Sequence, residues 1–218
     1  MQTTWLKQKG NRQCILFFAG WGMDPTPFSG IPVNESDLCM VFDYRQLSPI
    51  DLAPFVAYEQ LHLISWSMGV WVAAHLLAEQ RQQFTSLTAI GGTLEPIDQK
   101  QGIPPENYQS MLTEFSSEIL EGFYRNMFDE EAQLSRFLAH RPQRDIPALV
   151  QEMAAFQKSF TRLGPGVDIY SRKIITSRDR IFSGRNQMRA WGKGIGVARN
   201  WPHFPFFLIE DWCDLLRD

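Results

Sequence analysis

Three features are scarce in this 218-residue sequence, and each scarcity excludes a class of protein. Lysine and arginine number 21 against 24 acidic residues, a formal charge of −3, so no basic excess favours nucleic acid as a partner. The three cysteines lack metal-motif spacing, which predicts neither a disulfide framework nor a zinc site and favours a reducing, cytoplasmic compartment. No apolar run is long enough to cross a bilayer, so we expect a globular chain with no membrane partner.

Apolar, β-branched and aromatic runs of strand length recur in the first half of the sequence. Near-continuous runs of this kind are typical of a parallel sheet buried on both faces. Prolines between the first three runs predict loops there instead of helices. One helix, 68–82, rich in alanine and leucine, is expected between the third and fourth runs. The four predicted strands are 14–19 (CILFFA), 38–42 (LCMVF), 61–65 (LHLIS) and 87–90 (LTAI).

The second half begins with a predicted helical insert. Apolar residues recur there at four-residue spacing, as in Phe115, Ile119 and Phe123, which is typical of amphipathic helices. We assign residues 94–166 to a helical cap, and 1–93 with 167–218 to an α/β core. The prediction is a mostly parallel central sheet of about seven strands, with several flanking helices replaced by loops. The remaining expected elements are strands at 168–176 and 196–199 and a helix at 205–216.

The most informative stretch is 62–74 (HLISWSMGVWVAA), where an apolar strand leads through Ser67 directly into a helix. This is the layout of a nucleophile elbow, usually G-x-S-x-G. The sharp turn requires small residues two positions before and after the nucleophile. Gly69 meets this requirement, and Ser65 replaces the usual first glycine. A strand that ends in serine by chance is the alternative interpretation of this motif alone.

A serine nucleophile needs a positioned base. Of the four histidines, His203 lies in a loop, 200–205 (NWPHFP), between the last predicted strand and the last predicted helix. The α/β-hydrolase fold delivers its base from such a loop, after the nucleophile in chain order. A structural role for a histidine between apolar residues is the alternative. The other histidines are expected to be packed or solvated: His62, His75 and His140.

The orienting acid is expected just past a strand, and Asp179 stands directly after the predicted strand 168–176. The order Ser67, Asp179, His203 is then the chain order of the α/β-hydrolases. A surface aspartate between two arginines is the alternative, and Asp43, at the end of the second apolar run, is the second candidate acid. The weaker candidates are Asp168, Asp211 and Asp214.

Acyl transfer also needs backbone N–H groups that point at the developing oxyanion. Met68 supplies one by its position after the nucleophile. The second is expected from the loop after the first predicted strand, where Gly20 and Gly22 let the backbone turn inward. We therefore expect the N–H of Trp21 to be the second donor and its ring to form a wall of the acyl pocket.

With FFAGWGMD, SWSMG, SRDRIF and WPHFPF in this order, the chain resembles the BioG-type α/β-hydrolase esterases. These release pimeloyl-acyl carrier protein from its methyl ester in biotin synthesis. The resemblance implies Ser67 as nucleophile, His203 as general base and acid, and Asp179 as the acid that orients it. It implies Trp21 and Met68 as oxyanion donors and no metal or organic cofactor.

The resemblance further implies an apolar tunnel for the pimeloyl chain beneath the cap. Candidate lining residues are Tyr124, Met127 and Phe128, unless these simply pack the cap against the core. It also implies an acidic acyl carrier protein as partner, which a local basic patch would attract. The candidate docking residues lie in the cap, although a solvated helix face explains the same charges: Arg125, Arg136, Arg141 and Arg144.

Two other functions remain open at this point. The triad residues do not separate an oxygen ester from a thioester, so a general short-chain carboxylesterase or an acyl thioesterase is one alternative. A hydrolase-fold protein that binds an acyl chain or a partner without catalysis is the other, because Ser65 and Ala19 depart from the usual motifs. The sequence leaves the oligomeric state open, with a monomer favoured.

Overall fold

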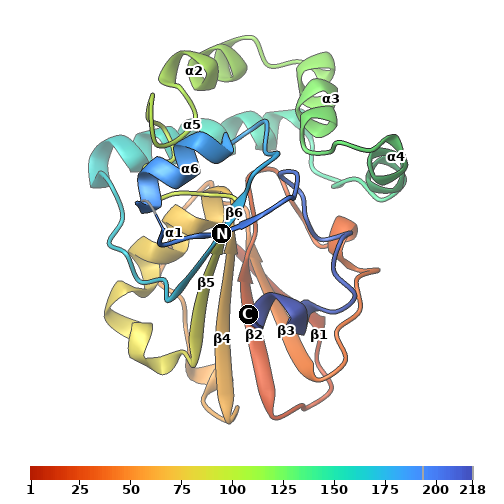
Figure 1. The fold of residues 1–218 in the computed structure, drawn as a ribbon, viewed down its shortest axis with the longest axis vertical. Coiled ribbons are helices and arrows are strands. Elements are labelled where there is room, and N and C mark those ends of the chain that lie inside the picture. Colours follow the sequence, from red (N-terminus) through yellow and green to blue (C-terminus); the bar gives the residue numbers. More distant parts are fainter. Residues whose placement is uncertain (193, 218) are drawn as a thin grey trace.

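The computed structural model describes residues 1–192 and 194–217, in which seven strands form one sheet of order β1-β3-β2-β4-β5-β6-β7 (Figure 1). Only β1 runs antiparallel to its neighbour, β3, among the described strand pairs. The predicted mostly parallel sheet is therefore confirmed. The strands are β1 (Gln2–Lys7), β2 (Gln13–Phe18), β3 (Ser36–Phe42), β4 (Gln60–Trp66), β5 (Ser86–Ile90), β6 (Arg172–Thr176) and β7 (Val197–Arg199).

Both faces of the central strands are buried, which is why their sequences are almost continuously apolar. In β2, Leu16 and Phe18 face one hydrophobic cluster, and Ile15 and Phe17 face another on the opposite side of the sheet. The antiparallel edge strand β1 was not predicted. Its residues are exposed or half-buried, so the sequence there has no comparable apolar run.

The loops predicted from proline are confirmed. Between β2 and β3, and between β3 and β4, the described chain forms only short 3-10 turns, η1 (Thr26–Phe28) and η2 (Ala53–Phe55). Each turn holds a proline in its first positions, where the missing N–H costs least. After β4 comes α1 (Met68–Leu77), which tightens into the 3-10 helix η3 (Ala78–Gln83) where one α-helix to residue 82 was predicted.

The C-terminal part differs most from the prediction. The helix α6 (Gly184–Trp191) was missed, and the expected helix at 205–216 is only the 3-10 helix η4 (Trp212–Leu216). Phe204 and Phe206 are both fully buried and pack against Trp66, two positions apart in sequence. Alternate residues face the same side in extended chain and not in a helix, so this aromatic packing excludes the predicted helix start. The strand expected from residue 168 begins at Arg172.

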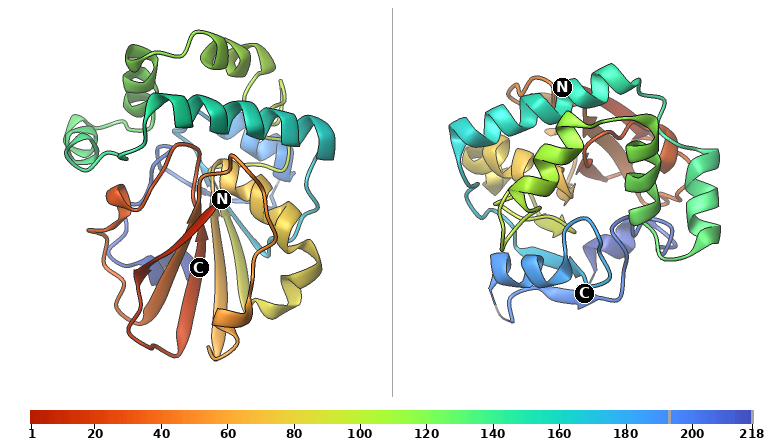
Figure 2. Two further views of the ribbon diagram at one scale, coloured as in Figure 1. Left: turned by 180° about the vertical axis from the view of Figure 1, so that it is seen from behind. Right: turned by 90° about the horizontal axis from the view of Figure 1, so that it is seen from above.

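Four described helices between β5 and β6 form a layer at one end of the sheet (Figures 1 and 2). This is the end where β2 and β4 finish, because the residues that follow these strands line one cavity together with residues of the layer. None of the described helices is long and apolar enough to cross a membrane. The four helices, hereafter the cap helices, are α2 (Pro105–Thr113), α3 (Ser117–Asn126), α4 (Glu131–Ala139) and α5 (Ile146–Leu163).

Candidate active site

Ser67 forms the turn between β4 and α1, with φ of +58° and ψ of −128°. Positive φ is unfavourable for a residue with a side chain, and Asp43 is the only other such residue in the described chain. The Ser67 N–H donates to the carbonyl of Ile90 at 3.0 Å, which ties the turn to the end of β5. This strained geometry lifts the Ser67 side chain away from the sheet and toward the cap helices.

The residues around the elbow are small because backbone passes close to them. A Cβ on Gly69 would overlap the carbonyl oxygens of both Phe18 and Ala19. A Cβ on Gly92 would overlap the carbonyl oxygen of Ser67. Gly69 was expected from the motif. Gly92 was not expected, because it is distant from Ser67 in sequence and only the folded chain brings the two residues together.

Gly69→Ala is expected to destabilise the protein by about 3 kcal/mol or more, because the new methyl group would meet two backbone oxygens that cannot rotate away. Urea unfolding measures the change in the free energy of unfolding. The matched control is Gly122→Ala, in the cap helix α3, where a Cβ meets nothing within 4 Å. That control should be neutral or slightly stabilising. Equal stability of the two variants would contradict the predicted crowding at the elbow.

His203 lies between Ser67 and Asp179. Its Nε2 is 3.1 Å from Ser67 Oγ, and its Nδ1 is 2.7 Å from Asp179 Oδ2. His203 is fully buried, and the other two residues are at most 6% exposed. The Trp66 indole N–H donates to the His203 carbonyl at 2.7 Å, and the Phe182 ring stacks nearly parallel to the imidazole. The three residues thus form one continuous, largely buried hydrogen-bonded chain.

The Asp179 carboxylate accepts hydrogen bonds on both oxygens. The N–H groups of Ile181 and Phe182 each donate to Oδ1 at 2.8 Å. The Thr176 hydroxyl donates to Oδ2 at 2.8 Å, and Gln187 Nε2 donates to the same oxygen at 3.2 Å. Gln187 is fully buried on α6, and sequence reasoning missed it. No local motif indicates the role of Gln187, because its contact with Asp179 forms only when α6 packs beside β6.

The second candidate acid, Asp43, is not paired with His203. It accepts from Arg45 and forms a 3.1 Å ion pair with Arg144. Although burial alone would raise the pKa of Asp43, hydrogen bonds and charge from Arg45 and Arg144 lower it to about 2. The weaker acid candidates lie elsewhere: Asp168 pairs with Lys173, while Asp211 and Asp214 cap η4.

The other three histidines stay outside the chain that joins Ser67 and Asp179. His62 Nδ1 contacts Ser86 Oγ at 2.8 Å, and His75 Nε2 contacts the Gly164 carbonyl at 3.2 Å. Burial lowers the pKa of both side chains, so both are favoured in the neutral form. His140 is exposed at the end of α4.

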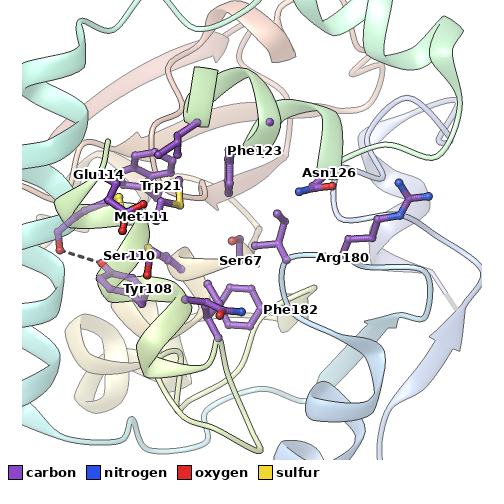
Figure 3. Close-up of a pocket in the computed structure, with 17 residues that line it drawn as sticks. Trp21, Ser67, Tyr108, Ser110, Met111, Glu114, Phe123, Asn126, Arg180 and Phe182 are labelled. Carbon is purple, nitrogen blue, oxygen red and sulfur yellow. Dashed lines mark hydrogen bonds between the residues drawn. The ribbon is translucent and has the colours of Figure 1, made fainter. Parts of the chain in front are cut away.

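Trp21 and Met68 border the same cavity as Ser67 (Figure 3). Gly22, with φ of +74°, turns the chain directly after Trp21. Within the described residues, neither the Trp21 N–H nor the Met68 N–H donates to a protein acceptor. The Trp21 indole N–H donates to the Leu149 carbonyl at 3.0 Å, and its ring forms the expected wall of the cavity. Two backbone donors are therefore available beside the serine.

The cavity has a volume of about 390 Å³, in the usual range for small-molecule sites. Its lining is mainly apolar around Trp21, Met111 and Phe123. Figure 3 shows Trp21 and Met111 on one side of Ser67, with Asn126 and Arg180 on the other. Ser67 therefore borders a cavity with a mainly apolar lining, with the polar side chains of Asn126 and Arg180 on one side of it.

The structure corrects the expected lining of this cavity. Tyr124, Met127 and Phe128 do not border it, are at most 3% exposed, and belong to the core cluster that contains Phe204. The lining residues of α3 come from the neighbouring face of the helix instead. Sequence periodicity identifies the apolar stripe of a helix and does not say which edge of it meets a cavity. The α3 residues that line the cavity are Ile119, Gly122, Phe123 and Asn126.

Of the four predicted docking arginines, Arg144 was predicted wrongly. Its side chain is 8% exposed and bridges Glu152 and Asp43, so it is not available to a partner. Arg125, Arg136 and Arg141 are exposed. The Arg136 guanidinium lies 4.1 Å from the centre of the Phe207 ring, which holds its charge near the surface.

Comparisons with known proteins agree with this architecture. A family model described as "Pimeloyl-ACP methyl esterase BioG" matches residues 1–213. The crystal structure of BioG from Haemophilus influenzae is 28% identical, with a TM-score of 0.87 over 99% of both chains. A hydrolase from Pseudomonas aeruginosa PA01 is 12% identical, with a TM-score of 0.61 over 99% of this chain and 94% of that one, which shows the fold alone.

A curated relative is longer than this chain. The malonyl-acyl-carrier protein O-methyltransferase of Bacteroides fragilis (strain 638R) is 37% identical over 183 residues. These residues make up 84% of this chain and 37% of that relative, so the chain matches about a third of the relative's length.

Proposed function

The chain belongs to the BioG family of pimeloyl-ACP methyl esterases, which have an α/β-hydrolase fold, and from this premise we propose how it works. It hydrolyses the methyl ester of pimeloyl-acyl carrier protein in biotin biosynthesis, with Ser67, His203 and Asp179 as its catalytic triad. The observation that carries the proposal is the hydrogen-bonded chain from Asp179 through His203 to Ser67, which opens into a mainly apolar cavity.

The reaction begins when Ser67 Oγ attacks the ester carbonyl and His203 Nε2 takes the hydroxyl proton. Asp179 accepts the Nδ1–H of His203 and stabilises the imidazolium that forms. The backbone N–H groups of Trp21 and Met68 donate to the oxyanion of the tetrahedral intermediate. The intermediate then collapses, and methanol leaves with the proton from His203.

The second half of the reaction releases the acid. His203, now neutral, takes a proton from a water molecule that attacks the acyl group on Ser67. The second tetrahedral intermediate collapses, Ser67 regains its proton, and the product keeps a free carboxylate. The carrier protein remains attached to the far end of the pimeloyl chain, so the cavity needs to hold only that chain while the carrier stays outside.

We propose that the carrier protein docks on three exposed arginines, Arg125 and Arg136 on the cap helices and Arg141 in the loop between α4 and α5. Acyl carrier proteins are acidic, so positive charge on this surface would speed their encounter with the enzyme. The compartment we propose is the cytoplasm, which suits three free and buried cysteines.

Charge reversal at Arg136 and Arg141 together is expected to raise KM for the carrier-bound methyl ester by about 10-fold, since each lost surface attraction contributes about 1 kcal/mol or less. The kcat should be unchanged, and so should kcat/KM for a short p-nitrophenyl ester. Steady-state kinetics on both substrates measures the difference. The control is charge reversal at Arg12 and Arg217, which are exposed outside the cap helices. Equal effects on the two substrates would count against docking at this surface.

Labelling with a fluorophosphonate tests the nucleophile independently of the substrate. We expect one label on the folded wild-type protein, mapped to Ser67 by peptide mass spectrometry, and no label on Ser67→Ala. Folded protein that resists labelling would contradict the esterase mechanism and favour a binding role. A comparison of the methyl ester with an acyl thioester of the same chain length then separates esterase from thioesterase activity.

A further inference from the structure

A buried carboxylate outside the triad connects the cap to the loop that carries Trp21. Glu152, on the cap helix α5, is 0% exposed. Its Oε1 accepts from the Tyr44 N–H at 2.7 Å, and its Oε2 accepts from the Gly22 N–H at 3.3 Å. These two N–H groups follow β3 and β2, so one side chain of the cap holds two loops of the sheet.

A buried carboxylate is costly unless it is paired and hydrogen-bonded. Arg144 Nη1 donates to Glu152 Oε2 at 2.5 Å, and Arg144 Nη2 lies 3.1 Å from Asp43. Burial raises the pKa of Glu152 above its usual value, although the charge of Arg144 and the two N–H groups oppose this shift. Each hydrogen bond to this carboxylate in the described structure comes from a donor, so the site is built to hold acceptor oxygens.

The loop between Ala19 and Gly22 is held at both ends by this arrangement. The Tyr44 hydroxyl donates to the Ala19 carbonyl at 2.7 Å, and Glu152 holds both the Tyr44 N–H and the Gly22 N–H. Between the two ends, the Trp21 indole N–H donates to the carbonyl of Leu149, which lies one turn before Glu152 on α5. The direction of the Trp21 backbone N–H is therefore set by contacts with α5.

We propose that Glu152 is a positioning residue that aims the Trp21 N–H at the reacting carbonyl oxygen and thereby couples the seating of the cap to the oxyanion hole. The inference builds on the proposed function, since it needs an oxyanion at Ser67. Oxyanion donors act through their fixed direction, so a small rotation of the Trp21 peptide weakens transition-state binding more than substrate binding.

The test is Glu152→Gln, which keeps the shape and replaces one acceptor oxygen by an NH₂ group among donors. With a short p-nitrophenyl ester, we expect kcat to fall by about 10- to 100-fold, part of the 10²- to 10³-fold loss seen when an oxyanion donor is removed. The KM should stay within about threefold. The inhibition constant of a trifluoromethyl ketone, which forms a tetrahedral adduct with the serine, should rise by the same factor as kcat falls.

The matched control is Glu131→Gln, an exposed glutamate of the cap helix α4, which should change none of these constants. If Glu152→Gln does not fold, Glu152→Asp keeps the charge but draws it back from Gly22, and the same division between kcat and KM is expected. A variant with lower thermal stability but wild-type kcat and inhibition constant would overturn the inference. Wild-type protein without Ser67-dependent turnover would instead overturn the proposed function, and the inference with it.

Discussion

Ser67→Ala is expected to lower kcat/KM for the methyl ester by roughly 10⁴- to 10⁶-fold, the loss typical when a triad nucleophile is removed. The fold should survive. Alanine is no larger than serine, so it fits the same turn at positive φ with similar strain, and the elbow's close approaches involve Gly69 and Gly92 instead. The remaining activity would come from the oxyanion donors and from substrate binding alone.

Ser48→Ala is the matched control, because Ser48 is exposed in the loop between β3 and β4 and does not border the cavity. Its kcat/KM should stay within about twofold of the wild type. Thermal unfolding should give both variants stabilities close to that of the wild type. A folded Ser67→Ala protein that retains more than about a hundredth of the activity would show that another group attacks the ester.

Asp179→Asn is expected to lower kcat by about 10⁴-fold, because the substitution selects the wrong histidine tautomer. The oxygen of the introduced amide can still accept from the N–H groups of Ile181 and Phe182. The NH₂ group of that amide then faces His203 Nδ1, which must act as acceptor. The proton moves to Nε2, the atom that has to accept the proton of Ser67. Steady-state kinetics should show the loss in kcat, with KM changed by only a few fold.

The control for this substitution is Asp51→Asn. Asp51 accepts the N–H of the residue two positions later, as Asp179 does, but it is exposed in the loop between β3 and β4. The kcat of Asp51→Asn should equal that of the wild type. Retention of more than about a tenth of wild-type kcat in Asp179→Asn would contradict the assignment of the acid and would reopen the question of Asp43.

The parts of the fold that sequence analysis predicted are those with a local cause. Strands buried on both faces have continuous apolar runs, and prolines exclude helices in two crossovers. The strand β1 was missed because it lies at the edge of the sheet and is largely polar, and the helix α6 was missed because its sequence is largely polar. The helix expected at 205–216 was wrong because Phe204 and Phe206 pack in an aromatic cluster with rings from four distant segments, Phe17, Phe28, Trp66 and Phe137.

In the candidate site, too, only the residues with a local sequence signal were predicted. Ser67, Gly69 and His203 carry local signals, a motif or a place in chain order. The role inferred for Glu152 has none, since its contact with Gly22 spans 130 residues and a glutamate on a cap helix predicts solvent exposure. Arg144 was predicted to belong to a docking surface because a charged residue in the cap is likewise expected to be exposed to solvent. Ion pairs between buried residues that are distant in sequence can be recognised only in the folded structure.

The most direct measurement is the mass of the carrier protein before and after incubation with the enzyme. Pimeloyl-acyl carrier protein methyl ester should lose the mass of one methylene group as the ester becomes a free carboxylate, and methanol should appear in equal amount. Ser67→Ala should leave the mass unchanged. The account would be contradicted if active wild-type enzyme left the carrier-bound ester intact, or if it cut the thioester and released monomethyl pimelate.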